Sequence, residues 1–148
     1  MSPSSSPSPS IGLGYTKYSR EAAVTLPSDD ADLSTLYTAA EVQKVSLIDG
    51  IFVDIGATDE YMIHEYKDFI DISTSIQINW RGKSTQDASK SPIFMQIYDR
   101  GAAGWVTIAQ DISAAASADV TLKAVIDDTT PYIDSHDVIA SRIYQEAV

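Results

Sequence analysis

The two histidines, His64 and His136, are the residues whose chemistry suits a general base or a transition-metal ligand. They lie far apart in the sequence, and neither has a second histidine at ligand spacing. The pair His64-Glu65 begins a zinc-protease pattern, but Asp68 occupies the position where that pattern requires its second histidine. We therefore expect no catalytic residue and no metal-ligating histidine, with His64 on a strand and His136 in a loop.

Other catalytic patterns are also missing from the sequence. The chain has no cysteine, which excludes disulfides, thiol nucleophiles and thiolate metal sites. Its serines do not form the Gly-x-Ser-x-Gly pattern of a nucleophile elbow, and Gly12-x-Gly14 lacks the third glycine of a dinucleotide site. The sequence therefore predicts a protein that is not an enzyme and holds no organic cofactor.

Aspartates gather in two parts of the sequence, and hard cations such as Ca²⁺ bind several carboxylate and carbonyl oxygens. Neither group has the spacing of an EF-hand loop. A structural Ca²⁺ is one interpretation of these residues, and a solvated acidic loop is the other. The residues are Asp29, Asp30 and Asp32 in the first group and Asp127, Asp128, Asp134 and Asp137 in the second.

Two tryptophans are candidates for stacking against a sugar ring. Trp80 alternates in phase with Ile76 and Ile78, which places it on the buried face of a strand. Trp105 follows a glycine-containing turn and is the better candidate for exposure. We therefore predict that Trp80 belongs to the core. For Trp105 two interpretations stand, contact with a ligand such as a glycan, or packing in the core or in an interface.

The composition indicates one folded domain with an acidic surface. The chain has 148 residues, and its 44% hydrophobic content suits a globular protein. The net charge of -11 repels phosphate backbones and anionic lipids, so we expect neither nucleic acid nor membrane as a partner. The N-terminus lacks the basic start and apolar run of a signal peptide, so if the protein reaches the outside of a cell, we expect it to do so by lysis, inside a particle or as a piece of something larger.

The first ten residues, MSPSSSPSPS, alternate serine and proline and favour extended geometry over packing. We interpret residues 1–14 as an extended arm and residues 15–148 as the folded domain. An arm of this kind can add to a sheet edge of a neighbouring subunit. The predicted partner-binding residues of the arm are Pro3, Pro7, Pro9, Ile11, Leu13 and Tyr15.

The rest of the chain reads as short strands with alternating apolar residues. Residues 11–23 are irregular with one edge strand. Thr38 and Glu41 form a capping box, which predicts a short helix over 38–43. Asp49-Gly50 predicts a hairpin between strands 44–48 and 51–55. This pattern predicts an all-β fold, a jelly-roll-like antiparallel β-sandwich of about seven or eight strands. The further strands are expected within 61–66, 75–80, 93–98, 105–108, 120–124 and 138–144.

Four strand patterns carry a resemblance to a recurring domain type. They are residues 78–84 (INWRGKS), 94–100 (FMQIYDR), 105–107 (WVT) and 138–145 (VIASRIYQ). Over residues 15–145 the chain resembles uncharacterised β-sandwich modules that follow Ser/Pro-rich linkers in surface or fibre-like proteins of environmental bacteria and phages. The resemblance implies an external structural or adhesive module, and it transfers no catalytic residue.

Two functions from different classes follow as hypotheses. The first is a structural subunit of a virion, as a phage capsid decoration or fibre protein, or of another extracellular assembly, in which the arm contacts copies of the same chain or another structural protein. The second is a carbohydrate-binding adhesion module of a surface protein, with Trp105 contacting a glycan. We favour the first, and both imply location in a virion or at an extracellular surface.

Overall fold

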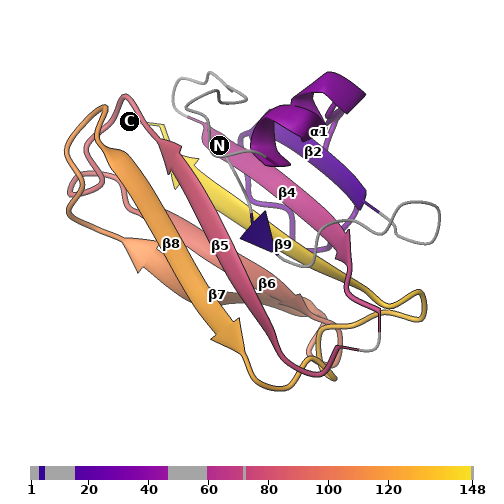
Figure 1. The fold of residues 1–148 in the computed structure, drawn as a ribbon. Helices are drawn as coiled ribbons and strands as arrows, with labels where there is room; N and C mark the ends of the chain where they lie inside the picture. The colour runs from indigo at the N-terminus through magenta and orange to yellow at the C-terminus, as the bar shows by residue number, and fades with distance from the viewer. Residues whose placement is uncertain (1–3, 6–15, 47–59, 72, 148) are drawn as a thin grey trace.

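A computed structural model describes residues 4–5, 16–46, 60–71 and 73–147 of the chain, and Figure 1 shows their arrangement. Seven strands of seven to nine residues, two strands of two residues and one helix make up these parts. In chain order they are β1 Ser4–Ser5, β2 Thr16–Ala23, β3 Thr35–Leu36, α1 Ala39–Ser46, β4 Tyr61–Phe69, β5 Ile76–Lys83, β6 Ile93–Asp99, β7 Gly104–Asp111, β8 Asp119–Ile126 and β9 Val138–Glu146.

The strands form two antiparallel sheets. The larger sheet has the order β3-β2-β4-β9-β6-β7, and the smaller has the order β1-β5-β8. In Figure 1 the smaller sheet lies over β9, β6 and β7, while α1 lies on the same side of the larger sheet, over β2 and β4. The predicted all-β antiparallel sandwich is therefore confirmed.

Alternation along the strands places one set of apolar residues between the sheets. Ile76, Ile78 and Trp80 of β5 are buried, as the sequence predicts. They face buried residues of the larger sheet such as Met95 and Ile97, within one continuous core. A fully buried side chain of this size stabilises the fold by roughly 1.5–3 kcal/mol, so this alternation accounts for much of the stability of the sandwich.

The helix begins as the sequence predicts and extends further. The Thr38 N–H donates to the Glu41 carboxylate at 3.0 Å, and the Glu41 N–H donates to the Thr38 hydroxyl at 3.2 Å. This confirms the capping box. The helix continues to Ser46, so the prediction of a strand from residue 44 is wrong over 44–46.

The cause of this error is that the cap starts a helix whose Val42 packs against the core, and this packing outweighs the strand-like pattern of the residues that follow. The remainder of the predicted hairpin, with Asp49-Gly50 and residues 51–55, lies outside the described residues.

Two smaller differences concern the strands. β2 is not an edge strand, because β3 and β4 flank it, although β3 pairs only with Ser19 and Arg20. The hairpin of β6 and β7 forms as predicted, with Asp99 opposite Gly104 across the turn. The predicted boundary between arm and domain, at residues 14 and 15, lies outside the described residues.

Candidate functional site

The N-terminal arm reaches the smaller sheet. Ser4 and Ser5 form β1 and pair antiparallel with β5, with Ser4 opposite Asn79 and Ser5 opposite Ile78. Among the described strands, β8 is the other neighbour of β5, so β1 lies on the opposite edge of β5 from β8. The predicted arm residues Pro3, Pro7, Pro9, Ile11, Leu13 and Tyr15 all lie outside the described residues.

Proline limits how far this ladder can extend. Pro3 and Pro7 flank β1 in the sequence, and proline has no backbone N–H to donate to a strand pairing. Of the eight residues of β5, β1 pairs with two. The arm therefore adds a short strand to a longer acceptor edge.

Trp105 is half-buried and packs against neighbouring side chains. Its indole N–H donates to the Asp29 carbonyl oxygen at 3.0 Å, and the Arg142 guanidinium lies 4.3 Å from the ring centroid. The Tyr98 ring packs at right angles nearby, with centroids 5.3 Å apart. The ring is half-buried, so it is not an open stacking platform in this structure, and its glycan contact stays a prediction.

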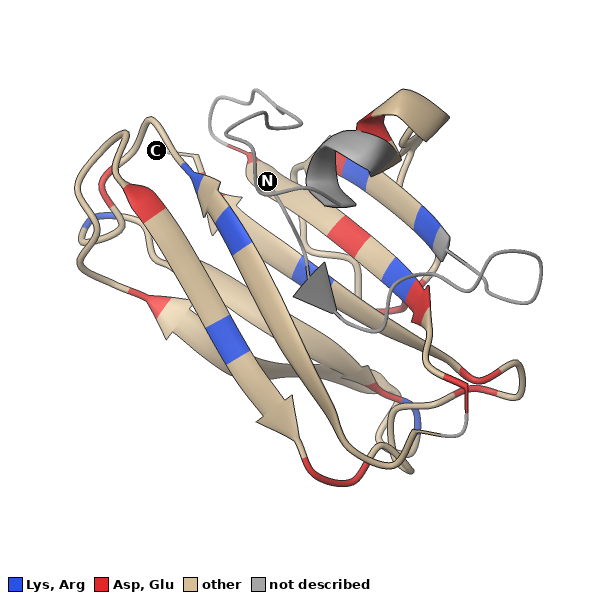
Figure 2. Cartoon of the chain, in the orientation of Figure 1, with Lys and Arg blue, Asp and Glu red and all other residues tan. Residues whose placement is uncertain are grey.

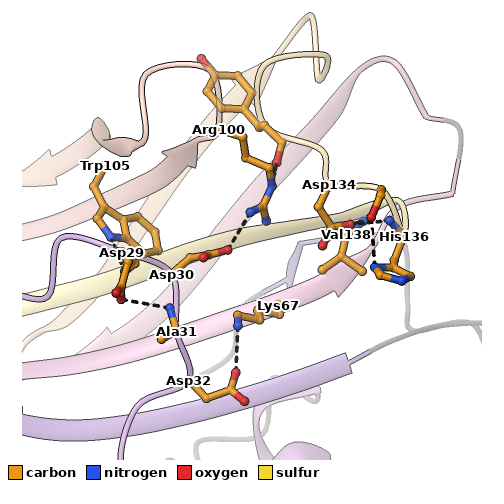
Figure 3. Close-up of polar contacts among 12 residues, drawn as sticks. Asp29, Asp30, Ala31, Asp32, Lys67, Arg100, Trp105, Asp134, His136 and Val138 are labelled. Carbon is orange, nitrogen blue, oxygen red and sulfur yellow. Dashed lines mark hydrogen bonds and ion pairs between the residues drawn. The ribbon is translucent and has the colours of Figure 1, made fainter.

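Residues 24–34, here called the crossing segment, run over the outer face of the larger sheet and cover part of Trp105 (Figure 3). Arg142 donates to the Pro27 carbonyl oxygen at 2.7 Å, and Arg100 pairs with Asp30 at 2.7 Å. Lys67 pairs with Asp32 at 2.9 Å, and Lys17 contacts the same carboxylate. Basic side chains from four strands or turns of the sheet therefore hold this segment in place.

Glu65 is a buried carboxyl group beneath the crossing segment. It is 2% exposed, and neither carboxyl oxygen has a hydrogen-bond partner among the described residues. Burial raises the pKa of Glu65 to about 8, and the carboxylates of Asp30 and Asp32 add to this effect, while Lys67 and Arg142 oppose it. At neutral pH the group is therefore largely protonated.

Arg142 lies directly opposite Glu65 across the ladder of β4 and β9, yet its hydrogen bonds go elsewhere. Its Nε donates to the Gln96 side-chain oxygen at 2.8 Å, and a terminal nitrogen donates to Pro27. Burial lowers the pKa of Arg142 to about 10. The Arg142 cation is thus held by the neutral oxygens of Gln96 and Pro27 and by the face of the Trp105 ring. The largely protonated carboxyl group of Glu65 lies opposite it on the neighbouring strand.

His64 lies on β4 as predicted and faces the interior. It is 4% exposed, and its Nδ1 is 2.5 Å from the Tyr37 hydroxyl oxygen. Burial lowers the pKa of His64 to about 3. The neighbouring Tyr18 hydroxyl donates to Asp68 at 2.7 Å, and the Tyr18 ring meets the Tyr37 ring edge to face, so two buried hydrogen-bonded pairs lie side by side in the core.

Most of the predicted Ca²⁺ ligands have local roles in turns or ion pairs. Asp128 accepts the N–H of Thr130. Figure 3 shows that Asp29 accepts the N–H of Ala31 and that Asp134 accepts those of His136 and Val138. His136 lies in a loop, as predicted. Within the described ranges, no group of three acidic or histidine residues is placed to hold a metal ion.

Sequence reasoning missed the Glu65–Arg142 pair, because a charged residue on a strand ordinarily indicates the solvent face. One signal is present: apolar Ile63 shares the face of Glu65, and a strand with apolar residues on both faces is covered on both.

No helix in the described part of the chain has the length and apolar character needed to cross a membrane. Comparison with family models, with curated proteins and with solved structures returned no match.

Proposed function

We propose that this protein is a non-enzymatic structural subunit that assembles with copies of itself through its N-terminal arm. The observation that carries the proposal is the pairing of β1 with the edge of β5. In the assembly, β1 of one copy adds to β5 of the next, which is a β-augmentation. A virion, as a capsid decoration or fibre protein, or another extracellular assembly is the setting we propose.

The length of the arm supports exchange between copies. Residues 6–15 join β1 to β2, and a chain of that length can extend on the order of 35 Å. The same β1 strand can therefore reach β5 of its own copy or of a neighbour. Exchange of an identical element between copies makes no new kind of contact, so it costs little.

The energetics of β1 suit a repetitive assembly. A ladder of two residues makes few hydrogen bonds, each worth about 1 kcal/mol net, so a single arm contact is weak. In a repeating assembly each copy both gives and receives an arm, and linked contacts strengthen one another through effective concentration. Assembly should therefore depend steeply on protein concentration.

The experiment compares oligomer mass by light scattering for four proteins. They are the full chain, a truncation lacking residues 1–14, the double variant Ser4→Pro/Ser5→Pro, and the control Ser8→Pro/Ser10→Pro. Proline in β1 removes ladder donors while keeping the arm, and the control adds the same prolines outside β1. Circular dichroism and melting temperature verify folding.

We expect oligomers from the full chain and from the Ser8→Pro/Ser10→Pro control, and folded monomers from the other two. A monomeric full chain would rule the proposal out, and so would a Ser4→Pro/Ser5→Pro variant that assembles like the unaltered protein.

A further inference from the structure

The outer face of the smaller sheet faces solvent and carries polar side chains except at Val125, which is exposed. Inward residues of β5 and β8 alternate with outward ones, as the burial patterns of both strands show. The outward face is formed by four pairs of residues that lie opposite each other across β5 and β8. These pairs are Gln77 with Val125, Asn79 with Lys123, Arg81 with Thr121, and Lys83 with Asp119.

This face is basic although the protein is strongly acidic. It carries three cations, Arg81, Lys83 and Lys123, and one carboxylate, Asp119, which lies 3.4 Å from Arg81. Its charge is therefore 3 − 1 = +2, and the rest of the chain carries −11 − 2 = −13. Figure 2 shows the three blue positions along β5 and β8.

An acidic loop lies at one end of the same sheet. Residues 127–137, here called the acidic loop, contain four aspartates and no lysine or arginine. The loop follows Ile126, which pairs with Ile76, whereas Lys83 pairs with Asp119 at the opposite end. Figure 2 shows red positions where this loop leaves β8. The charge of the smaller sheet therefore changes along its strands, from the basic outer face to the acidic loop at one end.

We propose that the basic outer face of β5 and β8 docks the acidic loop of a second copy. This inference rests on the proposed function, in which the chain assembles with itself, and it names a second contact besides the arm. A second copy is the favoured occupant because this one chain supplies both complementary surfaces. The contact joins two different surfaces, so it is head-to-tail and produces rings or filaments.

The test uses single charge reversals at exposed positions. Lys123→Glu reverses the centre of the basic face, and Asp127→Lys reverses the acidic loop at a residue that caps no turn among those described. Lys90→Glu is the matched control, because it makes the same change of net charge in the loop between β5 and β6. The net charges become −11 − 2 = −13 for both lysine variants and −11 + 2 = −9 for Asp127→Lys.

We expect Lys123→Glu and Asp127→Lys each to weaken self-association about three- to tenfold in sedimentation equilibrium, as for exposed ion pairs. An equimolar mixture of these two variants should recover the association of the unaltered protein, because opposite charges then meet at every contact. Lys90→Glu should associate as the unaltered protein does.

Several results would overturn the inference. If net charge alone governed association, Asp127→Lys would assemble more strongly than the unaltered protein. A mixture without recovery, or Lys90→Glu as weak as Lys123→Glu, would also exclude docking at this face.

Failure of this inference is distinguishable from failure of the arm proposal. If the arm variants become monomeric while Lys123→Glu associates as the unaltered protein does, only docking at the basic face is rejected. If the arm variants still assemble while the self-association of Lys123→Glu is weakened, only the arm proposal is rejected.

Discussion

Replacing Glu65 by glutamine should stabilise the protein at neutral and alkaline pH. The carboxyl group has a pKa of about 8 in the folded protein against 4.5 in its ordinary environment, because burial disfavours the charged form. In the unfolded chain Glu65 therefore loses its proton near pH 4.5, while the folded protein keeps it up to about pH 8. The contribution of Glu65 to stability is thus fully present below pH 4.5 and is lost as the pH rises to about 8.

The magnitude follows from the two pKa values. Each pKa unit corresponds to about 1.4 kcal/mol, so the loss is about 3 kcal/mol at pH 7 and at most about 5 kcal/mol above pH 8. Movement of the ionised carboxylate toward Arg142, directly opposite, would reduce the second figure. Glutamine keeps the shape of the protonated acid and does not ionise, so Glu65→Gln should lack this loss.

The assay is urea unfolding of the unaltered protein and Glu65→Gln from pH 4.5 to pH 9. The two should agree in stability near pH 4.5 and diverge up to about pH 8, above which the difference should stay constant. Glu146→Gln, which removes an exposed carboxylate at the end of β9, is the control and should track the unaltered protein. Parallel pH profiles for Glu65→Gln and the unaltered protein would refute the argument that Glu65 is buried without a hydrogen-bond partner in the described part of the chain.

Two further predictions concern the core. The pKa of His64 is lowered to about 3, so on acidification the unfolded chain binds a proton at this residue near pH 6.5, whereas the folded protein does so only near pH 3. Stability should therefore fall by up to about 1.4 kcal/mol per pH unit on acidification from pH 6.5 toward 3, and His64→Gln should flatten this slope in urea unfolding, whereas His136→Gln should not. Gly82→Ala should destabilise by about 1–3 kcal/mol, since the added Cβ would lie 2.4 Å from the buried Trp80 ring. A melting temperature unchanged by Gly82→Ala would show that the ring can move aside.

The sheet fold was predictable because its strands have a clear period. Ile76, Ile78 and Trp80 alternate with polar residues, and one side of their strand faces the other sheet. The capping box of Thr38 and Glu41 was also predictable from the sequence, because its two partners lie only three residues apart. Local signals of this kind need no knowledge of distant residues.

The polar site under the crossing segment was not predictable, since it depends on contacts between residues far apart in sequence. Pro27 and Asp29 have no pattern that indicates they will bind Arg142 and Trp105. The glycine turn before Trp105 made it a better candidate for exposure than Trp80, but a local turn carries no information about contact with residues 24–34. Burial of Glu65 follows from the same long-range contact.

The most direct test of arm-mediated assembly is disulfide trapping between two single-cysteine variants. The protein has no cysteine, so Ser4→Cys and Asn79→Cys, which lie opposite each other in the pairing of β1 with β5, provide the only thiols. The two variants are mixed, oxidised and analysed by mass spectrometry. We predict a disulfide that joins residue 4 of one chain to residue 79 of the other. If that link is absent from the mixture, while a Ser4→Cys/Asn79→Cys double variant closes only within single chains, the arm folds back on its own copy and the account is contradicted.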